Sequence, residues 1–94
     1  MPYSKKEYTF VKFERSHLPN KKYNAILKNK KTGREVKVPF GARNYEQYKD
    51  STGLGLYSNK DHGDKKRRAA YRARHRNDNL TDYSPGHFSW YFLW

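Results

Sequence analysis

The chain contains no cysteine and few aliphatic residues. Without cysteine, neither a disulfide framework nor a zinc site with thiolate ligands can form. Leu, Ile, Val and Phe make up 15 of the 94 residues, and highly charged chains with less than roughly 20% of these residues tend towards disorder. No run approaches the roughly 18 apolar residues of a membrane-spanning helix. The start of the chain lacks the apolar segment of a signal peptide, so we expect no secretion by that route.

Acidic residues are also scarce: the chain has 9 Asp and Glu and 21 Lys and Arg, so its formal net charge is +12. A positive field of this size attracts polyanions and opposes compaction of the chain. Nine Tyr and two Trp offset the shortage of aliphatics, since each aromatic side chain buries about 150–250 Å². The composition predicts one small basic domain over residues 1–94, of marginal stability and part of a larger assembly.

Alternating apolar residues in the first half of the chain predict a small antiparallel sheet within residues 9–40. The expected strands are 9–14, 23–28 and 35–40, and the residues expected to share a face are Val11 with Phe13, then Tyr23, Ala25 and Leu27, then Val36, Val38 and Phe40. Gly33 can take the positive φ of the hairpin turn between the last two strands. Pro39 cannot donate a ladder hydrogen bond, which predicts an edge strand or a strand end there.

The second half of the chain predicts a loop followed by two helices. Residues 41–63 show no clear period and are expected to form a flexible loop whose tyrosines pack on the domain. A basic helix over 64–76 begins at the capping residue Asp64 and is ended by residues 77–79. Ser84 and Pro85 begin a short aromatic helix that continues to the end of the chain. The predicted class is therefore α+β, with about three strands followed by the two helices.

The basic helix carries the strongest functional signal. Residues 65–76 contain seven cations and no acid: Lys65, Lys66, Arg67, Arg68, Arg72, Arg74 and Arg76. Like charges three or four positions apart repel one another, so this arrangement is costly without anions nearby. Counter-charges from the chain's own Asp61, Asp64 and Asp78 are one source, but nine acids cannot balance the surplus. We favour an external anion bound by these seven residues.

Tyr71 lies among these cations and has two interpretations. An aromatic ring beside arginines could stack on a nucleic-acid base. Alternatively, Tyr71 and the neighbouring alanines form the apolar stripe that docks the helix on the rest of the domain. We favour docking, because the helix has no other large apolar side chain.

The aromatic tail contains Phe88, Trp90, Phe92 and Trp94, and six of its last seven residues are apolar. Three interpretations remain open: a plug that completes the core, an anchor for a neighbouring protein, or insertion at a membrane surface. A chain this poor in aliphatics favours the plug.

No pattern in the chain predicts catalysis, a cofactor or a metal ion. His62 and Asp64, with other scattered histidines, match no standard metal-ligand spacing. A metal nuclease that uses these two residues is therefore the least favoured hypothesis.

Several segments in order resemble a family of small basic proteins of unknown function encoded by giant (nucleo-cytoplasmic large) DNA viruses and their environmental relatives. The most specific part is the helix pattern Asp64-x-x-Arg67-Arg68-x-x-Tyr71-x-x-Arg74-His75 followed by a tryptophan-rich end. The other segments are Phe13-Glu14-Arg15-Ser16, Lys21-Lys22-Tyr23-Asn24-Ala25, Val38-Pro39-Phe40-Gly41 and Tyr45-Glu46-Gln47-Tyr48. The resemblance implies a viral setting, where small basic proteins are commonly minor capsid, cement or genome-associated components.

Two functional hypotheses follow from the charge and from this resemblance. The first is a non-enzymatic structural protein of a virion, a minor capsid or cement component whose basic helix contacts acidic surfaces of capsid proteins. The second is a sequence-nonspecific DNA- or RNA-binding protein associated with the genome. The expected location is the virion, with the host cytoplasm or nucleus as the alternative.

Overall fold

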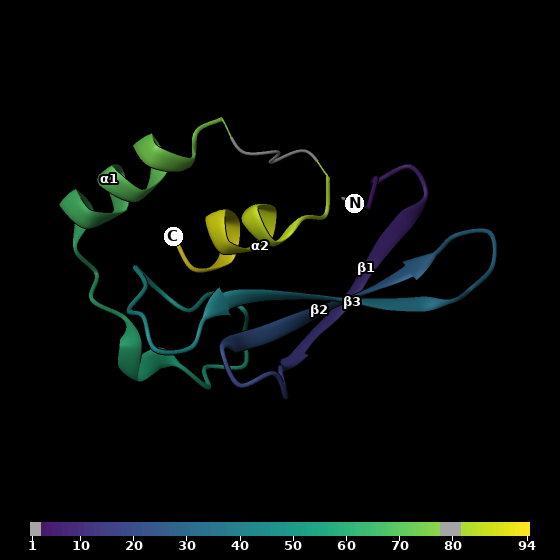
Figure 1. The fold of residues 1–94 in the computed structure, drawn as a ribbon, viewed down its shortest axis with the longest axis horizontal. Helices are drawn as coiled ribbons and strands as arrows, with labels where there is room; N and C mark the ends of the chain where they lie inside the picture. The colour runs from purple at the N-terminus through teal and green to yellow at the C-terminus, as the bar shows by residue number, and fades with distance from the viewer. Residues whose placement is uncertain (1–2, 78–81) are drawn as a thin grey trace.

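The computed structural model describes residues 3–77 and 82–94. It confirms the predicted α+β class, with a three-stranded antiparallel sheet followed by two helices. In chain order the elements are β1 (Tyr8–Arg15), β2 (Lys21–Asn29), β3 (Glu35–Ala42), the 3₁₀ turn η1 (Ser58–Lys60), α1 (Lys65–His75) and α2 (Pro85–Phe92). Figure 1 shows α2 close to the sheet, α1 at the periphery, and the β2–β3 turn extending away from both helices.

The sheet has the strand order β1-β2-β3, and both pairings are antiparallel. The central strand β2 is buried along most of its length. The strand β3 pairs with β2 on one side, where Pro39 lies opposite Asn24. The edge position predicted from Pro39 is therefore confirmed, because an edge strand leaves one side of its backbone without ladder bonds.

The core lies between one face of the sheet and α2. The predicted face of β2 is confirmed, since Tyr23, Ala25 and Leu27 are fully buried there. Phe88 of α2 and Leu93 just beyond it complete this cluster. A sheet with one apolar face needs a covering layer, and here the aromatic end of the chain supplies it.

The predicted pairing of Val11 with Phe13 on one face is wrong. The register between β1 and β2 shifts between Phe10 and Lys12, which leaves Val11 as the extra residue of a β-bulge. A bulge interrupts the alternation of side chains. Phe10 and Phe13 therefore share the core face, with ring centroids 4.7 Å apart, whereas Val11 is exposed.

Both helices begin at the predicted capping residues. The Asp64 side chain accepts hydrogen bonds from the backbone N–H groups of Lys66 and Arg67, and Ser84 accepts one from His87. The helix α1 ends one residue earlier than predicted, with Arg76 as its C-cap. Of the predicted terminator 77–79, residues 78 and 79 lie outside the described residues. No helix in the described ranges is long and apolar enough to cross a membrane.

The segment between β3 and α1 is the expected loop, interrupted by η1, and it carries internal hydrogen bonds that its sequence did not predict. Gln47 is completely buried, and its amide group donates to the Tyr57 carbonyl and to Asp61 Oδ1. Asp61 Oδ1 also accepts from the backbone of Asp50. Tyr57 packs on the core as expected, but Tyr45 does not, since 73% of its surface is exposed.

Candidate anion-binding site

The helix α1 has one side turned towards the protein and one turned towards solvent. Arg68, Tyr71, Arg72 and His75 are partly buried, and their spacing of three and four positions places them along one helix face. The remaining residues of α1, including Ala69, Ala70 and Ala73, are exposed. The expected contribution of the alanines to docking is therefore wrong, and long polar side chains take that place.

Two of the seven cations predicted to bind a partner are engaged within the protein. Arg68 Nε donates to the main-chain oxygen of Trp94 at 2.7 Å, and Arg72 Nη2 donates to the same oxygen at 3.2 Å. The Arg68 guanidinium also lies 4.8 Å from the ring centroid of Tyr48, and that of Arg72 lies 5.0 Å from that of Trp90. These cation–π contacts and hydrogen bonds attach α1 to the rest of the protein.

Tyr71 docks the helix, as predicted, by stacking on Trp94. The two rings are 4.4 Å apart and nearly parallel, with an interplanar angle of 7°. His75 lies on one side of this pair, 4.3 Å from Tyr71, and His62 lies on the other, 5.2 Å from Trp94. The four rings form a column that joins α1 to the end of the chain. No sequence pattern marked His62, because its contact with Trp94 is long-range, whereas His75 lies four positions from Tyr71 in the same helix.

Five predicted partner-binding cations face solvent. Arg67 forms an exposed ion pair with Glu46 at 3.0 Å, which lowers the pKa of the Glu46 carboxyl. Within residues 3–77 and 82–94 one other ion pair occurs, between Lys37 and Glu14 on the sheet. The α1 cations that therefore have no carboxylate partner there are Lys65, Lys66, Arg74 and Arg76. We call these four residues the outward cations.

The aromatic tail is part of the core, which favours the plug over the two surface interpretations. Phe88 and Leu93 are almost fully buried, and the Phe92 ring lies 4.7 Å from that of Phe13. Trp90 and Trp94 are partly buried against α1. Of this segment, only Tyr91 presents a largely exposed ring, so the tail offers little free apolar surface to a partner.

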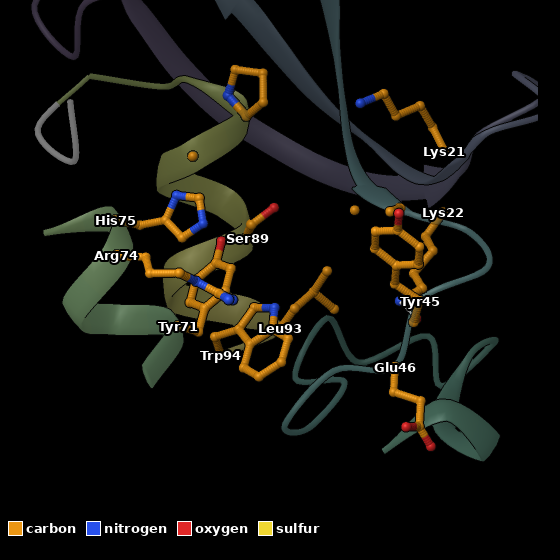
Figure 2. Close-up of a pocket in the computed structure, with 14 residues that line it drawn as sticks. Lys21, Lys22, Tyr45, Glu46, Tyr71, Arg74, His75, Ser89, Leu93 and Trp94 are labelled. Atoms are coloured by element: carbon orange, nitrogen blue, oxygen red, sulfur yellow. Dashed lines mark hydrogen bonds between the residues drawn. The ribbon is translucent and has the colours of Figure 1, made fainter. Parts of the chain in front are cut away.

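A cavity of about 400 Å³ opens between α1, α2 and the adjoining ends of β2 and β3. Figure 2 shows Tyr71, Arg74 and His75 of α1 on one side and Lys21, Lys22, Tyr45 and Glu46 on the other. Ser89, Leu93 and Trp94 lie between the two sides (Figure 2). A second hollow of about 350 Å³ shares Tyr45, Glu46, Arg74 and Trp94 with the first. We call the two together the α1 groove.

Lys22 is the least expected residue of this groove. It is 1% exposed, and its ammonium group donates to the Tyr45 carbonyl at 2.6 Å and to Gln47 Oε1. Burial, reinforced by the charge of Lys60, lowers the pKa of Lys22 to about 8. Alternation along β2 predicted a core face but gave no reason for a lysine on the other face to be buried.

Tyr23 and Asp50 fix the loop that carries Tyr45 and Glu46. The Tyr23 hydroxyl donates to Asp50 Oδ2 and accepts from the backbone of Leu56. Burial and the Asp50 carboxylate raise the pKa of Tyr23 to about 12. Burial acts to raise the pKa of Asp50, but hydrogen bonds from Thr52 and Tyr23 outweigh it and leave that pKa lowered.

His62 and Asp64, the residues of the metal nuclease hypothesis, are both used to begin α1. His62 Nδ1 accepts a hydrogen bond from the backbone N–H of Asp64, and the Asp64 carboxylate caps the helix. In the part of the chain that the structure describes, no group of three or more His, Cys, Asp or Glu residues could hold a metal ion.

Comparisons with known proteins identify no relative of this chain. No family model, no curated protein and no solved structure matches the chain. The resemblance to the giant-virus family therefore stays a prediction.

Proposed function

We propose that this protein is a non-enzymatic structural protein that binds an acidic partner through the solvent-facing side of α1. The observation that supports the proposal is the set of outward cations on a helix whose other side is fully used for docking. Lys65, Lys66 and Arg76 surround the exposed Ala69, Ala70 and Ala73. Small side chains between long cations let an acidic protein surface approach closely while its carboxylates meet the charges.

The setting of this function comes from the giant-virus resemblance. It makes the partner a capsid protein and the protein a minor capsid or cement component of a virion. A chain of charge +12 also gains stability from an acidic partner, because the partner reduces self-repulsion. Burial of the aromatic tail leaves charge, rather than apolar anchoring, as the main source of affinity.

Sequence-nonspecific binding to DNA or RNA is the second candidate. The observation that favours it is that Arg74 and Arg76 are exposed and carry guanidinium forks, which bind phosphate in a bidentate manner. Phosphate contacts carry no sequence information, so such binding would not select a site.

A titration at two salt concentrations tests the proposal. We expect a 20-residue glutamate-rich peptide to bind at about 50 mM salt, and a 20-base-pair DNA duplex to bind no more tightly than this peptide. Reversal of charge at Lys65, Lys66 and Arg76 to Glu should abolish peptide binding. The matched control reverses Lys28, Lys31 and Arg34, which changes the net charge equally at the exposed β2–β3 turn, and should retain most of the binding.

The same titration contains the outcome that would contradict the proposal. Submicromolar duplex binding that falls by orders of magnitude between about 50 and 200 mM salt would support the genome-associated candidate instead. Equal loss in both charge-reversed variants would show that net charge, and not α1, is responsible. Arg68 and Arg72 stay unchanged throughout, because their removal would detach α1.

A further inference from the structure

The α1 groove gathers more positive than negative charge. Lys21, Lys22 and Arg74 line it, whereas Glu46 is its single carboxylate among the residues described and already pairs with Arg67. The cations come from β2 and from α1, two elements that the fold brings to opposite walls (Figure 2). An anion in the groove would therefore meet cations from both sides.

Lys22 is a buried cation in the wall of the groove. An ammonium group has three N–H donors, and the recorded partners of Lys22 are two neutral oxygens. No ion pair of Lys22 occurs within the described ranges. Burial and the charge of Lys60 lower the pKa of Lys22, and the carboxylates of Asp50 and Asp61 offset this only in part.

Tyr45 supplies an exposed ring at the point where the two hollows of the groove meet. Its side chain is 73% exposed, while its main-chain oxygen is fixed by the hydrogen bond from Lys22. The other large rings of the groove, Tyr71 and Trp94, stack on each other, and His62 lies 5.2 Å from Trp94. Tyr45 is therefore the ring with a free face for stacking.

We propose that the α1 groove binds a nucleotide, with its phosphate between Lys21 and Arg74 and its base stacked on Tyr45. A cavity of about 400 Å³ falls in the size range of small-ligand sites. Stacking on an exposed aromatic beside a cationic track is the usual way in which proteins bind unpaired nucleotides. An acidic peptide would use the cations but would leave the Tyr45 ring without a role. This site is distinct from the outward face of α1 on which the proposed function rests, although Arg74 borders both.

The nucleotide has two sources, a free mononucleotide or a single strand of nucleic acid. The test titrates the full chain by calorimetry with adenosine 5′-monophosphate, adenosine, inorganic phosphate, a ten-residue oligothymidine and a hexaglutamate peptide. We expect the monophosphate to bind at least about tenfold more tightly than adenosine or phosphate alone, because both contacts are needed. If the affinity for the monophosphate exceeds the affinity for oligothymidine expressed per nucleotide, the ligand is a free nucleotide. The reverse order identifies a single strand.

Two pairs of variants locate the binding. Tyr45→Ala keeps the main-chain oxygen that holds Lys22, and we expect it to weaken monophosphate binding at least about fivefold. Arg74→Ala should weaken it about tenfold or more. Tyr91→Ala and Lys31→Ala remove an exposed tyrosine and an exposed cation that do not line the groove, so affinity should stay within about twofold.

Three results would overturn the proposal. The first is equal binding of phosphate and monophosphate, and the second is unchanged affinity in Tyr45→Ala. The third is tighter binding of hexaglutamate than of either nucleotide probe, which would assign the groove to an acidic peptide.

Discussion

At the scale of single residues, Lys22 lies in a buried position that disfavours the charged form of its ammonium group. The ammonium group keeps two hydrogen bonds but loses most of its contact with water. The folded protein therefore binds this proton less tightly than the unfolded chain, with a pKa of about 8 in place of the ordinary 10.5. Charge on Lys22 opposes folding at neutral pH, and its neutral form does not.

Replacement of Lys22 by methionine should change how stability depends on pH. Between pH 8 and 10 the unfolded chain binds more protons at this position than the folded chain, so wild-type stability should rise with pH. The free energy of unfolding of the wild type, minus that of Lys22→Met, should increase by about 1 to 2 kcal/mol from pH 8 to pH 10, since one pKa unit corresponds to about 1.4 kcal/mol. Urea denaturation at several pH values measures this difference.

The measurement stops at pH 10 because above this pH the ionisation of Tyr23 lowers the stability of the protein as pH rises. Its phenol ionises near 10 when unfolded and near 12 when folded, so stability falls as pH rises through that range. A constant difference between wild type and Lys22→Met from pH 8 to 10 would show that Lys22 is solvated like an ordinary lysine.

Gly41 is fixed at the edge of the core by both its conformation and its neighbours. Its φ is +78°, and a Cβ there would lie 2.9 Å from Leu93 Cδ1. Gly53 has a similar φ of +86°, but a Cβ there would have no atom within 4 Å. The two positions share the backbone strain and differ in packing.

Gly41→Ala should therefore destabilise the protein more than Gly53→Ala. We expect the control to lose about 1 kcal/mol from the positive φ alone. Gly41→Ala should lose about 1 to 3 kcal/mol more, because Leu93 must move within the core. Chemical denaturation of both variants gives the comparison. Equal losses would mean that the end of the chain adjusts without cost.

At the scale of elements, α1 is attached through side chains alone. None of its residues is buried, and its contacts include the ring column, the two arginines bound to the Trp94 oxygen and their cation–π contacts with Tyr48 and Trp90. Elements with little buried apolar surface open locally at low free-energy cost. We therefore expect the basic helix to loosen while the sheet and α2 stay folded.

Tyr71→Ala should release α1 without unfolding the sheet. We expect amide hydrogens of α1 to exchange at least about tenfold faster, because the stacking on Trp94 is lost, while those of β2 change little. Tyr91→Ala removes an exposed ring from α2 and should leave both sets unchanged. Faster exchange in β2 equal to that in α1 would show that the helix belongs to the same cooperative unit as the core.

At the scale of the whole molecule, local patterns predicted the elements and long-range contacts decided the site. Alternation at Tyr23, Ala25 and Leu27 was sufficient to place β2, and the caps at Asp64 and Ser84 were sufficient to begin both helices. The residues that make up each of these signals lie close together in the sequence, so each element could be predicted from its own segment. The α+β class followed from them.

The orientation of α1 could be predicted only in part. Tyr71 was predicted on the docked side, but cations surround most of the circumference, so nothing distinguished Arg68 and Arg72 from the exposed cations. The α1 groove depends on residues as distant as Lys22, Tyr45 and Arg74, which only the completed fold brings together. The β-bulge at Val11 was missed because no glycine or other local signal marks it.

The late position of the covering layer has a consequence for synthesis. The three strands are complete by Ala42, whereas Phe88 and Leu93, which close their apolar face, are translated much later. At about 5–20 residues per second, the ribosome takes several seconds to cover that distance. During this interval the nascent sheet carries an unprotected apolar surface, so chaperone demand should be greatest just before the aromatic segment emerges.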